Sequence, residues 1–429
     1  MEWIDVPSEG LTLRDIRRIT KRDQAESEDI RKAVEAILAD IEQRGDAAVR
    51  EYTKRFDGVD LDSFLVSPEE IDDAVDIVGP DFMAILEEAA ANIRAYHERQ
   101  VEQTWIDTFR PGVRLGAKFT PIQRVGVYVP GGTAAYPSTV LMDTIPAHVA
   151  GVPSIAVFTP PAKDGSVNPY ILAAAHVAGA TEIYKVGGAQ AIAALAFGTE
   201  SVPKVDKIVG PGNIYVALAK KAVFGFVSID SIAGPSEIMV LADETANPRF
   251  VAADLLSQAE HDEMASAILV TTSRDLAEQV SKEVEGFVAQ LSRKEIIQKS
   301  LDNYGYILVA ESMDEAIATV NEIASEHLEL VTKNPFETMT KIRNAGAIFV
   351  GEYSSEPLGD YFAGPNHVLP TNGTAKFFSP LSVDDFIKKS SIISYSREAL
   401  EPIYKDIVQF AECEQLTAHA NSIRVRFED

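Results

Sequence analysis

From residue 124 onward, short β-branched runs alternate with alanine-rich stretches of helical periodicity. The first set has strand-like runs at 125–129, 154–158, 182–186 and 207–209, and helical stretches at 140–149, 169–178, 189–197 and 214–223. A second set has strand-like runs at 237–241, 267–271 and 306–309, and helical stretches at 248–259, 276–290 and 314–324. This alternation is typical of parallel sheets covered by helices. The sequence therefore predicts an α/β protein with two halves.

The regions outside this alternation have a different character. Residues 28 to about 100 show apolar residues at helical spacing, for example at 31–41 and 82–96, and predict consecutive helices. Beyond residue 380 the pattern indicates short helices, followed by a strand-like end at 422–426. This last segment is too short to fold alone.

Charge and composition exclude several kinds of partner. The formal net charge of the 429 residues is −26, which argues against binding to nucleic acid or to an anionic membrane. No apolar run reaches the roughly 18 residues that span a bilayer. The first residues, Met-Glu-Trp-Ile-Asp-Val-Pro, lack the basic and apolar regions of a signal peptide. We therefore expect a cytoplasmic protein.

The single cysteine, Cys413, excludes an intramolecular disulfide and a cluster of thiolate ligands. Although it precedes Glu414, we expect a buried, inert thiol rather than a nucleophile.

Three glycine-containing turns each follow a predicted strand and precede a predicted helix: Pro130-Gly131-Gly132-Thr133, Gly187-Gly188-Ala189-Gln190 and Gly210-Pro211-Gly212-Asn213. Backbone N–H groups at such helix starts suit a pyrophosphate. None of the turns is the G-x-G-x-x-G motif, and no acidic residue stands at the distance expected for a ribose. For any one turn alone, ordinary turn chemistry is the better explanation.

Four of the seven histidines lie near carboxylate or amide side chains in the last part of the chain. These groups are Gln258 with His261, Glu326 with His327, Asp360 with His367, and Glu414 with His419. The spacing of Gln258 and His261 places both on one face of a helix, where one metal ion could bind both. The pattern predicts a metal site combined with acid-base chemistry, although a lone Gln-x-x-His pair is more often a surface pair.

Several long segments resemble the histidinol dehydrogenase family, and the resemblance covers nearly the whole chain. The segments are 44–57, 129–138, 186–193, Gly210-Pro-Gly-Asn213, Gly234-Pro-Ser-Glu237, Gln258-Ala-Glu-His261, Ser325-Glu-His327, 359–371 and 416–422. The resemblance implies oxidation of the amino alcohol L-histidinol to L-histidine through an aldehyde, with two molecules of NAD and one zinc ion per site. It also implies a homodimer with shared active sites.

The implied fold has two Rossmann-like domains that lack the G-x-G-x-x-G motif, with small helical segments at both ends. We expect an N-terminal arm at 1–27 and a first domain, carrying the catalytic and metal residues, at 28–127 and 237–380. The second domain is expected at 128–236, and a dimerisation tail at 381–429.

By the same resemblance, the metal ligands are Gln258, His261, Asp360 and His419, with the substrate completing the coordination. These oxygen and nitrogen ligands suit zinc but also accept manganese or cobalt. His327 is the implied general base, since its ordinary pKa near 6.5 suits this role. Glu326 is expected to activate the water that hydrates the aldehyde, although it could merely orient His327.

The remaining implied contacts concern the substrate and the cofactor. Ser236, His367 and Glu414 correspond to positions that contact the substrate, as the metal ligands and His327 also do. Tyr128, Gln190 and Asn213 correspond to positions that contact NAD. Asp143 and His148 stand where the family usually has asparagine and a basic residue, which leaves their effect on cofactor affinity open.

Three alternatives use the same residues. A related zinc and NAD dehydrogenase of another small alcohol, such as a sulfonated diol, is disfavoured by the segments 132–138 and 416–421, where such relatives diverge. A zinc hydrolase is disfavoured because neither His261 nor His327 begins the H-E-x-x-H motif that is usual in such enzymes. A metal-binding protein without catalytic activity is disfavoured because the three glycine turns would have no function in it.

Overall fold

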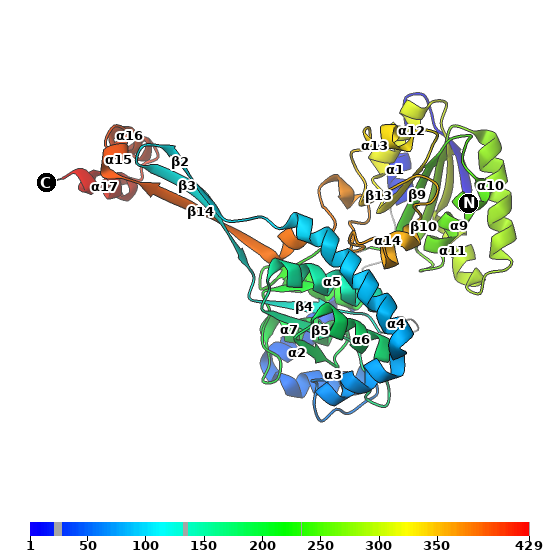
Figure 1. The fold of residues 1–429 in the computed structure, drawn as a ribbon, viewed down its shortest axis with the longest axis horizontal. Coiled ribbons are helices and arrows are strands. Elements are labelled where there is room, and N and C mark those ends of the chain that lie inside the picture. Colours follow the sequence, from blue (N-terminus) through cyan, green and yellow to red (C-terminus); the bar gives the residue numbers. More distant parts are fainter. Residues whose placement is uncertain (21–27, 132–135, 233, 429) are drawn as a thin grey trace. The chain divides into compact units, whose positions relative to one another are not determined.

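The computed structural model describes residues 1–20, 28–131, 136–232 and 234–428. Its contacts divide the chain into two compact units (Figure 1). Unit 1 comprises Met1–Gln100 and Gln123–Phe386, and unit 2 comprises Val101–Ile122 and Ile387–Asp429. Among the described residues, no helix is both long enough and apolar enough to cross a membrane.

One sheet of unit 1 has six parallel strands in the order β1-β11-β10-β9-β12-β13. The strands are β1 (Glu2–Asp5), β9 (Glu237–Ala242), β10 (Ser266–Thr271), β11 (Gly305–Val309), β12 (His327–Val331) and β13 (Ala347–Val350). If β1 is left out and the other strands are numbered along the chain, their order across the sheet is 3-2-1-4-5. This is the Rossmann order. The predicted Rossmann-like fold is confirmed for this sheet.

The two faces of this sheet are covered by different helices (Figure 1). Alternate residues of β9 point to opposite faces, as the strand period requires. Ile238 and Val240 pack with α9 (Pro248–Ala259), α10 (Arg274–Val288) and α11 (Lys294–Tyr304). Met239 and Leu241 pack with α1 (Leu13–Thr20) and α12 (Met313–Ile323). The short helices α13 (Pro335–Met339) and α14 (Glu356–Tyr361) follow β12 and β13.

The other sheet of unit 1 has five parallel strands in the order β6-β5-β4-β7-β8, which is the same Rossmann order. The strands are β4 (Arg124–Tyr128), β5 (Ser154–Phe158), β6 (Glu182–Tyr184), β7 (Lys207–Val209) and β8 (Ser228–Ile229). The connecting helices are α5 (Pro137–Ala150), α6 (Pro169–Ala178), α7 (Gly188–Phe197) and α8 (Ile214–Val223). Residues 189–196 of α7 are all buried, because alanine at most positions lets neighbouring elements approach closely.

The expected grouping of residues 28–127 with 237–380 is wrong. The predicted helices are present as α2 (Glu28–Arg44), α3 (Asp46–Phe56) and α4 (Pro68–His97), the last broken at Gly79. However, α2 packs against α7 and α8, and α4 packs against α5 and α6, so they cover the five-stranded sheet. The apolar side chains of α2 share a core with the alanines of α7, and the β-strand pattern could not show this choice of sheet.

The N-terminal segment is also more than an arm, because β1 pairs with β11 at the edge of the six-stranded sheet. Residues 21–27 of the expected arm lie outside the described residues, as do Gly132 and Thr133 of the first glycine turn.

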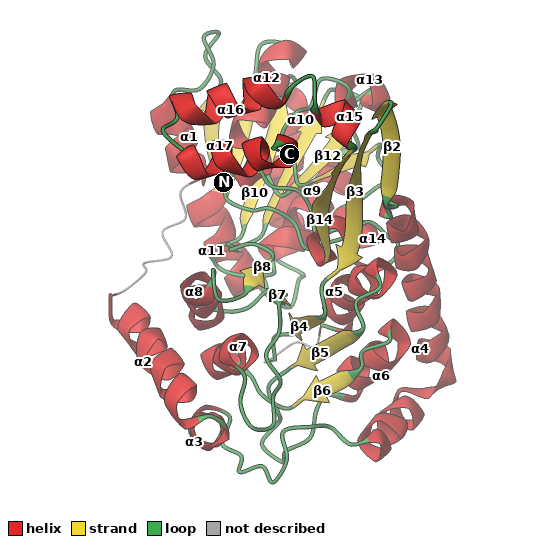
Figure 2. Ribbon diagram, turned by 90° about the vertical axis from the view of Figure 1, so that its left-hand side faces the viewer, coloured by secondary structure: helices red, strands yellow, loops and turns green. Residues whose placement is uncertain are grey.

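Unit 2 consists of three antiparallel strands and short helices. The strands are β2 (Trp105–Arg110), β3 (Val113–Pro121) and β14 (Ile387–Tyr395), which lie side by side in Figure 2. The helices are α15 (Arg397–Leu400), α16 (Tyr404–Cys413) and α17 (Thr417–Arg424). The tail therefore pairs with residues from before the first Rossmann strand, and residues 422–426, expected to be strand-like, are helical instead. Cys413 is exposed, which corrects the expectation of a buried thiol.

Candidate active site

His327 begins β12 at the amino edge of the six-stranded sheet, and its side chain is almost completely buried. Its Nδ1 lies 2.9 Å from the carbonyl oxygen of Glu237. Because a carbonyl only accepts hydrogen bonds, Nδ1 carries the proton and Nε2 keeps the lone pair. Nε2 is buried and has no hydrogen-bond partner among the described residues. Burial, followed by the nearby charges of His261 and His367, lowers the pKa of His327 to about 3, so its imidazole is neutral at physiological pH.

Glu326 and Glu237, at the start of adjacent strands, form two reciprocal hydrogen bonds between backbone N–H groups and side-chain carboxylates. The backbone N–H of Glu237 donates to Oε2 of Glu326 at 2.8 Å, and the N–H of Glu326 donates to Oε2 of Glu237 at 3.1 Å. The Oε2 of Glu326 lies 3.6 Å from Nδ1 of His327, which is beyond a normal hydrogen bond. The Glu326 carboxylate is therefore on the protonated side of the imidazole.

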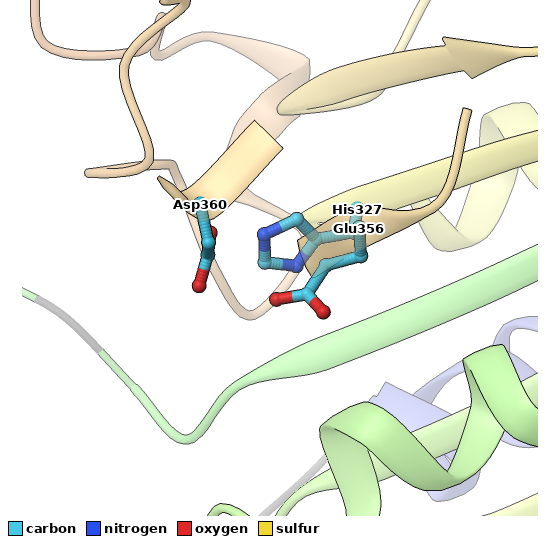
Figure 3. A group of neighbouring side chains, drawn as sticks. All are labelled: His327, Glu356 and Asp360. Atoms are coloured by element: carbon cyan, nitrogen blue, oxygen red, sulfur yellow. The ribbon is translucent and has the colours of Figure 1, made fainter. Parts of the chain in front are cut away.

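Three side chains that can bind a metal meet in unit 1: His327, Glu356 and Asp360. One ligand atom from each lies within 4.8 Å of those from the others, and Figure 3 shows the side chains turned toward one another. Glu356 and Asp360 occupy α14 four residues apart, so they share one face of this helix. Burial, and then the charge of Asp360, raises the pKa of Glu356 to about 8. Burial also raises the pKa of Asp360 to about 6.

The sequence analysis did not identify Glu356. Its spacing of four residues from Asp360 is the one signal that could have revealed it, but acidic pairs at this spacing are common on exposed helices. In the structure, its backbone N–H donates to Oε1 of Glu329 at 2.8 Å, and its Oε2 accepts from the Ser257 hydroxyl at 3.1 Å.

Gln258 lies in the last turn of α9, whereas His261, expected on the same helix, lies in the turn just after it; their side chains are nevertheless close. The Gln258 Nε2 atom is 3.2 Å from the His261 Nδ1 atom. The Oε1 atom of Gln258 is buried and has no hydrogen-bond partner among the described residues, whereas the His261 residue is exposed. The charge of His261 lowers the pKa of both His327 and Glu356, which places it near the same group.

His367 connects this group to the other half of unit 1. Its Nδ1 lies 3.6 Å from Oδ1 of Asp360, and its Nε2 lies 3.4 Å from the Thr139 hydroxyl on α5. Burial is the main cause that lowers its pKa to about 4. Ser236 immediately precedes β9 and is half-buried. The chain thus brings Gln258, His261, Asp360 and His367 close to His327.

A cavity of about 1140 Å³ opens at the carboxyl edge of the five-stranded sheet. Tyr128, Gln190 and Asn213 all line it, as does Gly188 of the second glycine turn. Tyr128 ends β4, and its hydroxyl accepts the backbone N–H of Gly188 at 3.0 Å. Burial raises the pKa of this hydroxyl to about 12. Carboxyl edges of Rossmann sheets are the usual binding sites of nucleotides.

Asn213 is placed in the cavity wall by its role at the start of α8. Its side-chain oxygen accepts the backbone N–H groups of Tyr215 and Val216 at 3.0 and 3.2 Å. The nearby helix α7 begins at Gly188 without a side-chain cap. Two helix N-termini, which favour negative charge, therefore border the cavity.

Glu414 and His419 belong to unit 2, and the structure does not group them with the residues above. Both are exposed and line a hollow of about 910 Å³ beside α16 and α17, together with apolar side chains such as Ile407 and Phe410.

Comparison with known proteins agrees with this architecture. The family profile described as "Histidinol dehydrogenase" matches residues 20–427. A histidinol dehydrogenase from Caldanaerobacter subterraneus is 58% identical over 412 residues, covering 96% of this chain and 95% of that protein. One from Bacillus subtilis is 57% identical over 402 residues, covering 94% of each.

Similarity also extends to a solved structure. The crystal structure of histidinol dehydrogenase from Elizabethkingia anophelis superposes with a TM-score of 0.94 at 41% identity, covering 99% of this chain and 98% of that one. On these grounds, the chain belongs to the histidinol dehydrogenase family.

Proposed function

We propose that this protein catalyses the NAD-dependent, four-electron oxidation of L-histidinol to L-histidine through the aldehyde, with one zinc ion in each site. These are the last two steps of histidine biosynthesis. The observation that supports this most directly is the buried, neutral imidazole of His327, which lies among groups that can bind a cation. Its Nε2 has no hydrogen-bond partner in the part of the chain that the structure describes. Membership of the family supports the choice of substrate.

The donor atoms in unit 1 fit a zinc ion. Gln258 offers a buried oxygen that has no hydrogen-bond partner among the described residues, and His261 offers a ring nitrogen beside it. Asp360 offers a carboxylate whose pKa is raised by burial. With His419, these residues form an oxygen and nitrogen set that zinc accepts. When bound, the ion supplies a fixed positive charge that holds the imidazole and amine of the substrate.

In the first step, Nε2 of His327 takes the hydroxyl proton of L-histidinol while a hydride passes to NAD. This yields the aldehyde, NADH and a protonated imidazole. The negative charge of Glu326, whose carboxylate lies 3.6 Å from Nδ1, stabilises the protonated imidazole. The low pKa of His327 means that it readily gives the proton up again to solvent.

In the second step, water adds to the aldehyde and a second hydride leaves from the hydrate, giving the carboxylate and a second NADH. We assign Glu326 to the activation of this water, and Ser236, His367 and Glu414 to contacts with the substrate. Tyr128, Gln190 and Asn213 are assigned to NAD, because all three line the cavity at the carboxyl edge of the five-stranded sheet.

The proposal includes a homodimer with shared sites. Glu414 and His419 of unit 2 would complete the site of the partner subunit. Both side chains are exposed in the single chain and border the same apolar hollow, as expected for groups whose partners lie on another surface.

NADH formation with L-histidinol tests the proposed activity. We expect two NADH for each L-histidinol consumed and L-histidine as the product. A hydrolase would form no NADH, and a dehydrogenase of sulfonated diols would prefer that substrate over L-histidinol in kcat/KM. Either result would contradict the proposal.

A further inference from the structure

Lys220 of α8 and Asp230, immediately after β8, form an ion pair inside unit 1. Their side chains are only 4% and 5% exposed, and Nζ of Lys220 contacts Oδ1 of Asp230. Each side chain also bonds to Gly210. Nζ of Lys220 donates to the Gly210 carbonyl oxygen at 2.8 Å, and the Gly210 N–H donates to Oδ2 of Asp230 at 2.8 Å.

This pair needs an explanation beyond stability. Burying two charges is costly, and apolar residues of similar size often stabilise a core equally well or better. Here the two charges hold both polar groups of a single residue, with hydrogen bonds of the strong, charge-assisted kind. The arrangement therefore fixes the orientation of the Gly210 backbone.

Gly210 connects two walls of the proposed NAD cavity. Its φ of +108° lies in a region that favours glycine, and a Cβ atom there would lie 2.0 Å from the backbone oxygen of Tyr128. Gly210 thus packs directly against the end of β4. It also begins the turn that leads to Asn213, which caps α8 and lines the cavity with Tyr128.

We propose that Lys220 and Asp230 are positioning residues for NAD, which hold the Gly210–Asn213 turn in the geometry that binds the cofactor. They do not line the cavity, and they act through Gly210 on Tyr128 and Asn213. This inference rests on the proposed NAD site and adds the residues that give the site its shape.

The test measures NAD affinity by calorimetry, together with KM for each substrate, in Lys220→Met and in the double variant Lys220→Met/Asp230→Leu. We expect NAD affinity to fall by about tenfold or more, since charged hydrogen bonds to the turn are lost. KM for L-histidinol and the metal content should not change. The double variant removes both charges together, so it avoids an unpaired buried charge and should keep the fold.

An ion pair at the other edge of the five-stranded sheet provides a matched control. Arg124 and Glu182 lie at the amino ends of β4 and β6, with Nη2 of Arg124 2.6 Å from Oε2 of Glu182, at the edge opposite the cavity. Arg124→Met should lower the melting temperature without changing NAD affinity. If the double variant keeps wild-type NAD affinity, or if Arg124→Met weakens NAD binding equally, the positioning role is refuted.

Asn213→Ala separates failure of this inference from failure of the cofactor site. If the wild type binds NAD and Asn213→Ala weakens that binding, the site is correct, and the Lys220 variants alone decide the positioning role. If the wild type does not bind NAD, or if Asn213→Ala has no effect on binding, the proposed site fails and the inference fails with it.

Discussion

At the scale of single residues, the chemistry of His327 is set by its backbone neighbour. The Glu237 carbonyl fixes the proton on Nδ1, and burial keeps the ring neutral, so Nε2 is the nitrogen that can act as a base. The sequence could assign His327 by family resemblance. It could not show the tautomer, because the hydrogen bond joins two strands whose residues are 90 positions apart.

We expect His327→Asn to lower kcat by roughly 10²–10⁴, the usual contribution of a positioned base. Metal content and NAD affinity should remain close to wild type, because the change removes Nε2 but none of the proposed ligands. Steady-state kinetics with metal analysis checks this. A variant with unchanged kcat and reduced metal content would instead make His327 a ligand, together with Glu356 and Asp360.

The metal assignment is tested by comparing His261→Asn with Glu356→Gln. Loss of a neutral imidazole ligand should lower metal content and activity together in His261→Asn. Glu356→Gln should retain its metal, because Glu356 is not in the proposed ligand set. Chelators should inactivate the wild type reversibly, and full activity in a metal-free preparation would disprove the assignment.

Glu326→Gln should separate the two oxidation steps. The first hydride transfer relies on His327, whereas hydration of the aldehyde needs a base for water. Aldehyde oxidation should therefore lose more activity than alcohol oxidation in single-turnover assays of each step. Equal losses would show that Glu326 only orients His327, a role that its position near Nδ1 also permits.

At the scale of elements, most strands and helices of the two Rossmann-like halves were predicted because each follows a local pattern, whereas β8, α11 and β13 were not. The partners of α2 to α4 were not, since an amphipathic helix shows that it covers a core but not which one. Glu356 was missed for a similar reason. Its importance arises from contacts between α14, α9 and β12, which its spacing from Asp360 alone does not show.

Helix α5 carries an unusual group for a buried element. Asp143 is completely buried, and neither carboxyl oxygen has a hydrogen-bond partner among the described residues. Burial, and then the charge of Asp230, raises its pKa well above the ordinary value of 3.8. Between 3.8 and this raised pKa, the folded protein keeps a proton that the unfolded chain has lost. The free energy of unfolding therefore falls as the pH rises above 3.8.

Asp143→Asn should remove this penalty and raise the free energy of unfolding at pH 7 by roughly 1–3 kcal/mol. The gain should shrink toward pH 4, where the unfolded chain also holds the proton. Denaturant unfolding at both pH values measures the difference. The exposed Asp73→Asn on α4 is the control, and an equal gain in both variants, or a gain independent of pH, would contradict this explanation.

At the scale of the whole molecule, the sequence indicated that residues 381–429 cannot form a domain alone. The structure adds that β14 pairs with β3, so unit 2 draws on two segments more than 260 residues apart. Such long-range pairing leaves no local signal. Unit 2 carries Glu414 and His419, whereas the proposed base His327 and the ligands Gln258, His261 and Asp360 lie in unit 1.

Shared sites make a prediction about mixtures of inactive proteins. His327→Asn damages the site in unit 1, and His419→Asn damages the contribution of unit 2, so each homodimer should be inactive. Under conditions that exchange subunits, half of the dimers are mixed. In each of these, one site combines an intact unit 1 with an intact unit 2 from the partner subunit.

Activity should therefore recover to about a quarter of wild type for a symmetric dimer with two sites. Mass spectrometry of the intact complexes verifies that mixed dimers have formed. As a control, mixing His327→Asn with His261→Asn should restore nothing, because both changes lie in unit 1 and every site then contains a damaged unit 1. Mixed dimers without recovery in the first experiment would mean that each chain builds its active site from its own two units.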